Sequence, residues 1–372
     1  MKKIIASIIV VIIGYFGFFY KQSPRTAQNN SPILIGTIIS QTGIASAYGE
    51  ASKNGATLAM EEINKNGGIN GRTVKLIHED DATDPKTGVG LYKKLTSLDH
   101  VDAIIGSNFD FVVSALFGVA STSNTVIITP TSARIVGSVD TNKNSFTTLS
   151  DFSTIVYALD GYLTKTPYKK LAVIHYTSGF GEEITKTLNN ISVKNNKGIV
   201  VEETYNQFGI TDWGPYILKM KKQGVDMIFA DMLGDDFTRF AIESKRLGWN
   251  VQLITHEDIR DMLNKKGTDL SALQGVVVLN WDVLGDDANF TKKFTERFGH
   301  GPELHAAQAY VTTYVLAQAI SESNGNTETL VHNLETETFE TPLGKFSFSK
   351  DHAGNSTPVK IQKIVGNKLI KI

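Results

Sequence analysis

Side chains able to carry out catalysis are present in this sequence, but none stands in a spacing that a known chemistry requires. Neither a phosphate-binding G-x-x-x-x-G-K-[ST] loop nor a G-x-S-x-G nucleophile elbow occurs. Gly88 and Gly90 lack the third glycine of a dinucleotide-binding fingerprint, and they fall inside a helical pattern. These absences do not exclude an enzyme, but no motif supplies a nucleophile, a base or a cofactor loop that would argue for one.

Metal binding is equally unsupported by the residue spacing. His78 and His256 are each followed by glutamate, but Ala82 and Arg260 stand where a zinc motif needs its second histidine. The acidic segment 80–85 lacks the glycine and the terminal glutamate of a calcium loop, so it is better explained as a strand-to-helix turn with an aspartate cap. We expect no metal and no cofactor.

Composition limits the class of protein. The chain has 372 residues, of which 41% are hydrophobic and 20% charged, which is typical of a folded protein with about two domains. Residues 1–31 hold four bases and no acid, so the rest carries 33 bases against 38 acids, a net charge of −5. This mildly acidic body argues against a nucleic-acid partner. Cysteine is absent, which excludes disulfides and a lipid-modified N-terminal cysteine.

The N-terminus predicts export from the cytoplasm. Lys2 and Lys3 precede an apolar run at 4–20, which polar residues follow up to residue 31. The run has 17 residues, near the lower limit for a membrane-spanning helix, and no small-x-small cleavage site follows it because Arg25 lies two residues before Ala27. Residues 1–31 are therefore either a signal peptide or a membrane anchor with a linker. In both cases the body works outside the cytoplasmic membrane.

The rest of the chain alternates short apolar runs with amphipathic segments, which predicts an α/β fold of two doubly wound layers. We expect strands at 33–39, 73–79, 101–106, 126–129, 171–175, 199–204, 227–231, 252–255 and 276–279, with β segments at 344–349 and 357–372. We expect helices at 49–65, 211–223, 235–247, 287–298 and 306–323. Gly67 and Gly68 are predicted to end the first helix with positive φ, and Asn70-Gly71 to form a tight turn.

An ordered set of short motifs connects these elements. It comprises Asn54-Gly55-Ala56, 61–64, 67–71, 80–85, 103–106, 128–132, 172–175 followed by 180–182, and 226–229. One such motif alone is weak evidence for a family. The ordered set resembles the leucine/isoleucine/valine-binding protein family, the type I periplasmic binding proteins for branched-chain amino acids and amides. The resemblance covers residues 32–372.

The resemblance implies two Rossmann-like lobes joined by hinge crossovers, with a small solute bound between them. Lobe one would be 32–149 with 283–344, and lobe two 150–282 with 345–372. It further implies a monomeric, non-catalytic solute-binding protein that delivers its ligand to an ABC permease. A membrane-anchored sensory ectodomain of the same fold is the alternative.

The family's ligand positions fall on particular residues of this chain. Carried across by the resemblance, the candidates are Tyr48, Asp110, Thr131, Ser132, Ala133, Phe180, Asp231, Glu257 and Trp281. The three aromatic residues can equally be core residues. Ser132 can be a turn residue, and Glu257 either pairs with a ligand ammonium group or caps a helix.

Two of these positions depart from the family's pattern. Asp110 stands where amino-acid binders have a serine for the ligand carboxylate, and Ala133 replaces a threonine. Asp110 either faces the ligand or N-caps a helix at 111–121. With Asp231 and Glu257 the pocket would be acidic, which disfavours a ligand carboxylate. We therefore expect a cationic or neutral ligand; if Asp110 turns away from it, an ordinary amino acid remains the alternative.

Overall fold

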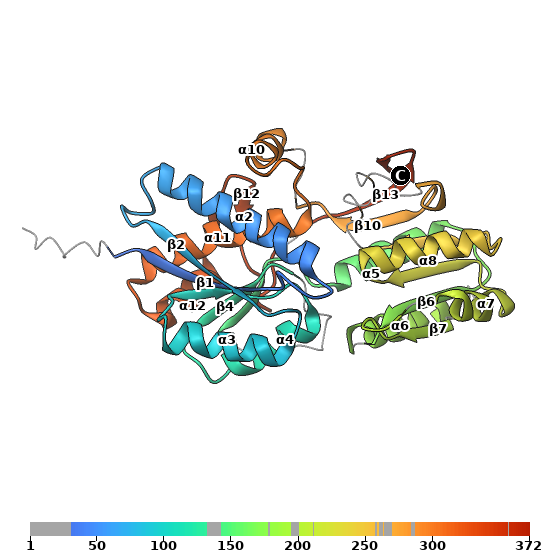
Figure 1. Cartoon of the computed structure of the whole chain (residues 1–372), viewed down its shortest axis with the longest axis horizontal. Coiled ribbons are helices and arrows are strands. Elements are labelled where there is room, and N and C mark those ends of the chain that lie inside the picture. Colours follow the sequence, from blue (N-terminus) through green and yellow to red (C-terminus); the bar gives the residue numbers. More distant parts are fainter. Residues whose placement is uncertain are drawn as a thin grey trace, which may run out of the picture. The chain divides into compact units, whose positions relative to one another are not determined.

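The described residues form two large β-sheets, each covered by helices on both faces, and a small two-stranded sheet (Figure 1). The computed structural model describes residues 31–131, 143–177, 179–194, 201–210, 212–256, 259, 263, 270–283, 287–355 and 357–372. The apolar run at 4–20, expected to be a hydrophobic helix, lies outside this set. Among the described helices, none combines the length and the apolar character needed to cross a membrane.

The first sheet is wholly parallel and has the strand order β2-β1-β3-β4-β5. Its strands are β1 (Ile33–Ile39), β2 (Val74–Asp80), β3 (Ala103–Ile105), β4 (Val126–Thr129) and β5 (Ser145–Thr147). The helices α2 (Ser46–Lys65), α3 (Pro85–Ser97) and α4 (Asp110–Ala120) connect successive strands. Because helices cover both faces, the strands are apolar runs rather than polar–apolar alternations.

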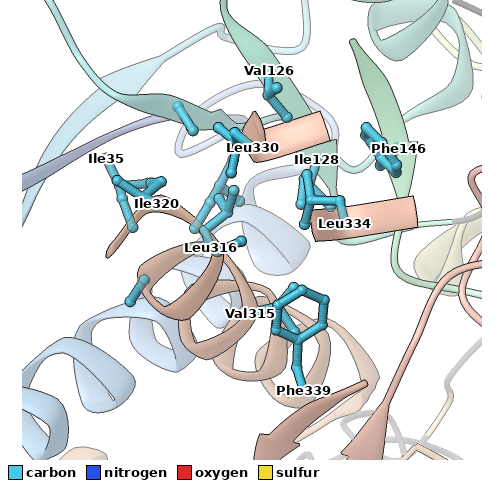
Figure 2. Packing of buried hydrophobic residues seen from close by; sticks show 14 of the residues in the cluster. Ile35, Val126, Ile128, Phe146, Val315, Leu316, Ile320, Leu330, Leu334 and Phe339 are labelled. Carbon is cyan, nitrogen blue, oxygen red and sulfur yellow. The ribbon is translucent and has the colours of Figure 1, made fainter. Parts of the chain in front are cut away.

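Two apolar clusters cover the faces of this sheet. On one face, strand residues such as Ile35 and Ile128 pack against α2, α11 (Leu304–Ser323) and α12 (Thr327–Thr336). Figure 2 shows Leu316 of α11 and Leu334 of α12 in this cluster. On the other face, α3 and α4 pack against Ile38, Ile104 and Ile127. Alternate strand residues therefore belong to opposite clusters, as the strand pleat requires.

The second sheet is mixed and has the strand order β14-β13-β10-β9-β8-β6-β7. Its strands are β6 (Leu171–Tyr176), β7 (Val201–Tyr205), β8 (Met227–Asp231), β9 (Gln252–Thr255), β10 (Val277–Trp281), β13 (Val359–Val365) and β14 (Lys368–Lys371). The last two are antiparallel and the others parallel. Helices α5 (Ser153–Lys165) and α6 (Gly179–Lys194) cover one face, and α7 (Gly214–Lys222) and α8 (Gly234–Arg246) cover the other. The other elements are η1 (Leu270–Ala272), α10 (Ala288–Phe298) and the hairpin of β11 (Phe339–Thr341) and β12 (Gly344–Phe346).

The two-lobe α/β architecture predicted from the sequence is confirmed, with small shifts of element boundaries. Strands β5 and β11 were not predicted, because each has three residues and shows no apolar run. Helices α5, α6 and α12 were not predicted either. The lobe boundaries at 149, 282 and 344 stay predictions.

The turn after α2 and the start of α3 follow the predicted chemistry. Gly67 and Gly68 have φ of +93° and +79°, and a Cβ on Gly68 would lie 2.0 Å from the carbonyl oxygen of Arg72. The Asp84 carboxylate accepts a hydrogen bond from the backbone N–H of Thr87 at 2.7 Å. The acidic segment is therefore a helix cap rather than a calcium loop.

Candidate functional site

Polar side chains converge at the carboxyl edge of the second sheet. Tyr176 and Asp231 are the last residues of β6 and β8, and His256 follows β9 directly. The parallel register pairs His175 with Asp231 and Ala230 with Thr255, so the three strands end at one level. This is the edge at which parallel α/β sheets bind solutes.

Asp110 joins these residues from the other lobe. It is the first residue of α4, and its Oδ1 accepts a hydrogen bond of 3.1 Å from the Tyr176 hydroxyl. We call Asp110, Tyr176, Asp231 and His256 the strand-end cluster. Phe109 and not Asp110 is the N-cap residue of α4, but the Asp110 carboxylate still interacts with the backbone N–H of Phe111 at the start of the helix. The helix begins one residue earlier than predicted, and the carboxylate contacts lobe two.

Asp231 lies at the deepest point of the strand-end cluster. Its side chain is 1% exposed, and its Oδ1 lies 2.9 Å from His256 Nε2. Because an ionised carboxylate only accepts hydrogen bonds, Nε2 carries the hydrogen of this pair. Asp231 Oδ2 is buried and has no hydrogen-bond partner in the part of the chain that the structure describes. A buried acceptor without a donor is costly and calls for a functional explanation.

The electrostatics of the strand-end cluster change the ionisation of Asp110. Burial, with the Asp231 charge as the second cause, raises the pKa of Asp110 to about 6, against a smaller opposing effect of the hydrogen bond from Tyr176. Asp110 is therefore about half ionised near pH 6. Removing water and placing two carboxylates near each other both favour the protonated acid.

Aromatic residues lie on both sides of the strand-end cluster. In lobe two, Phe152 contacts His256 and Trp281 with ring centroids 4.8 and 5.8 Å apart. The Trp281 indole N–H donates to Thr154 Oγ1 at 3.0 Å. In lobe one, Tyr48 packs edge-on against His305 at 4.7 Å. Through Phe152 and His256, these rings extend the buried apolar surroundings up to Asp231.

Apolar contacts also cross between the lobes beside Asp110. Leu233, which lies between β8 and α8, packs into the lobe-one cluster that contains Tyr48 and Phe109. Phe111, next to Asp110, contacts Phe208 with centroids 6.2 Å apart. Phe208 nevertheless stays 62% exposed. The first turn of α4 is thus a point of contact between the lobes.

The structure brings some of the predicted ligand residues together and leaves others untested. Asp110 and Asp231 meet in the strand-end cluster, whereas Tyr48 and Trp281 are buried in aromatic groups beside it. Thr131 is half-buried after β4, and Phe180 lies in the first turn of α6. Ser132, Ala133 and Glu257 lie outside the described residues.

Sequence reasoning missed Tyr176 and His256 as candidate site residues. Both stand at the carboxyl ends of predicted strands, so the rule that solutes bind at strand ends was the signal available for them. Among the described residues, no group of three His, Asp or Glu side chains could hold a metal ion. A pocket of about 530 Å³ opens beside α12, lined by Asn124, Lys143, Asn326 and His332 among others, and it shares no residue with the strand-end cluster.

Comparison with known sequences gives a match over almost the whole described region. A family model described as periplasmic binding protein matches residues 32–368. The Leu/Ile/Val-binding protein homolog 2 of Brucella abortus is 27% identical over 337 residues, covering 85% of this chain and 86% of that protein. The leucine-, isoleucine-, valine-, threonine-, and alanine-binding protein of Pseudomonas aeruginosa is 25% identical, covering 83% of each.

Solved structures share the fold at lower sequence identity. The substrate-binding protein LivJ of Streptococcus pneumoniae, in complex with isoleucine, has a TM-score of 0.79 at 20% identity and covers 91% of this chain and 97% of that one. A solute-binding protein of an ABC transporter from R. palustris, in complex with benzoate, has a TM-score of 0.80 at 19% identity and covers 92% and 95%. The fold therefore accommodates ligands of different chemistry.

Proposed function

Since the chain belongs to the periplasmic binding protein family, to which the leucine/isoleucine/valine-binding proteins belong, we propose that it is the solute-binding component of an ABC importer. Members of this family are solute-binding proteins and not enzymes. The proposed ligand is a small amino-acid-like, amide or amine solute bound between the lobes. It would be handed to permease subunits in the membrane.

One observation carries this proposal most directly. The carboxyl ends of β6 and β8 in one lobe and the first turn of α4 in the other supply polar side chains to the same place. A solute held there would contact both lobes at once. Only a ligand that contacts both lobes can favour the closed arrangement over the open one.

The location follows from the family, while the mode of attachment is proposed. Membership of the periplasmic binding proteins indicates an extracytoplasmic protein. We infer that residues 4–20 direct its export and either are removed or stay as an anchor. The sensory alternative finds no support in the relatives and structures named above, so we favour transport.

A solute screen tests the proposed function. We expect thermal-shift assays against amino acids, amides, polyamines and ureas to give at least one compound that raises the midpoint of unfolding, because a ligand that binds only the folded state stabilises it. Small-angle scattering with that compound should then show a smaller radius of gyration. Unchanged scattering despite calorimetric binding would contradict closure between lobes, and a screen without any binder would contradict the proposed function.

A further inference from the structure

We propose that the ligand carries a cationic nitrogen group, an ammonium or an amidinium, which binds between the carboxylates of Asp110 and Asp231. This inference rests on the proposed solute-binding function and specifies the class of solute. It disfavours a ligand that would place a carboxylate at Asp110, because this side chain and Asp231 are both acidic.

The first argument concerns hydrogen bonds. Asp231 is 1% exposed, and its Oδ1 is occupied by His256 while Oδ2 has no partner among the described residues. Among the described residues, Tyr176 and Asp231 are the titratable side chains that act on Asp110, and His256 lies against Asp231. Tyr176 donates its hydroxyl hydrogen to Asp110, so no described neighbour offers a hydrogen to Asp231 Oδ2. A ligand N–H would supply the missing hydrogen-bond donor to Asp231 Oδ2.

The second argument concerns charge. Asp110 and Asp231 come from different lobes and repel each other, which contributes to the raised pKa of Asp110. A cation placed between them would offset this repulsion. Its N–H groups would also donate a charge-assisted hydrogen bond to each carboxylate, and such bonds are stronger than neutral ones. A ligand anion at the same place would meet two negative groups. Discrimination between a cation and its anionic analogue should therefore reach about a hundredfold or more.

The third argument concerns protons. A cation favours the ionised form of Asp110, whereas burial and the Asp231 charge raise the pKa of this carboxyl group to about 6. Binding therefore releases a proton below that pH, so the affinity must fall as the pH decreases. One linked proton with this pKa weakens binding about tenfold between pH 7 and pH 5.

Sets of compounds that share one molecular skeleton but differ in charge test the inference, with the full-length protein as the binding partner. The probes are benzamidine, benzamide and benzoate, then leucinamide, leucine and 4-methylpentanoate, and finally the same charge series built on the best hit of the solute screen. Calorimetry at pH 7 is expected to rank the cation first on the scaffold that binds. Asp231→Asn should weaken that cation at least tenfold, and the exposed Asp235→Asn should leave it unchanged.

A second variant covers the case in which Asp231→Asn folds poorly. Asp110→Asn should weaken the cation and also abolish the loss of affinity between pH 7 and pH 5. If the anion or the zwitterion ranks first, or if neither variant affects the affinity of the best hit, the charge inference is wrong while the binding function stands. If no solute in the whole screen binds, the proposed function itself fails.

Discussion

At the scale of single residues, ionisation of Asp110 lowers the stability of the protein, although the proposed cationic ligand requires the ionised form. The carboxyl is partly buried beside Tyr176 and near Asp231, and its pKa is raised to about 6 from 3.8. Between these two values the folded state binds more protons than the unfolded state. Stability therefore decreases as the pH rises through this range, and it stays reduced above it.

Asp110→Asn should remove this loss of stability at higher pH, because asparagine does not ionise. We expect the variant to be more stable than the wild type at pH 8 in the absence of ligand, by about 2–3 kcal/mol, because a pKa unit corresponds to about 1.4 kcal/mol. The two proteins should converge near pH 4. The measurement is the unfolding midpoint as a function of pH, with Asp235→Asn as the exposed control. Parallel pH profiles of wild type and variant would refute the assignment.

At the scale of elements, the contact of α2 with α11 positions the lobe-one half of the site. A Cβ on Gly55 of α2 would lie 1.9 Å from the carbonyl oxygen of Ala306 in α11. The glycine therefore permits a close approach that any larger residue would prevent. Tyr48 of α2 and His305 of α11 meet at one end of the same helix pair. Displacement of these helices would move both aromatic rings.

Gly55→Ala should consequently destabilise the protein by about 1–3 kcal/mol, the usual cost of overpacking. Gly90→Ala is the matched control, because Gly90 also lies in a helix but a Cβ added there would have nothing within 4 Å of it. That substitution should be neutral or stabilise by up to about 1 kcal/mol through helix propensity. Urea unfolding of the two variants compares them directly. Equal midpoints would show that the close approach of α2 to α11 does not require a glycine at position 55.

At the scale of the whole molecule, we propose that the N-terminal segment sets the location of the two lobes. Lys2, Lys3 and the apolar residues 4–20 lack a clean cleavage site, so we expect the mature protein to stay attached to the outer face of the membrane. Membrane fractionation combined with mass determination of the N-terminus measures this. A soluble product that begins near residue 28 would show ordinary secretion instead.

The sequence by itself determined the architecture and the family. Apolar runs, helix stop signals and the glycines at 67, 68 and 71 predicted both sheets, because these features act locally and leave a trace in neighbouring residues. It failed for helices α5, α6 and α12 and for the strands β5 and β11. These two strands have three residues without an apolar run, and pairing with a neighbouring strand stabilises them.

Only the tertiary structure decided the relation among the site residues. Asp110 and Tyr176 are 66 positions apart, and no local pattern indicates that their side chains form a hydrogen bond between the lobes. The same holds for Asp231 and His256, which are brought together by the register of β8 and β9. The residue types and the strand ends can be predicted from the sequence. The burial of the site carboxylates, their unsatisfied acceptor and their mutual repulsion arise only when distant segments pack against each other.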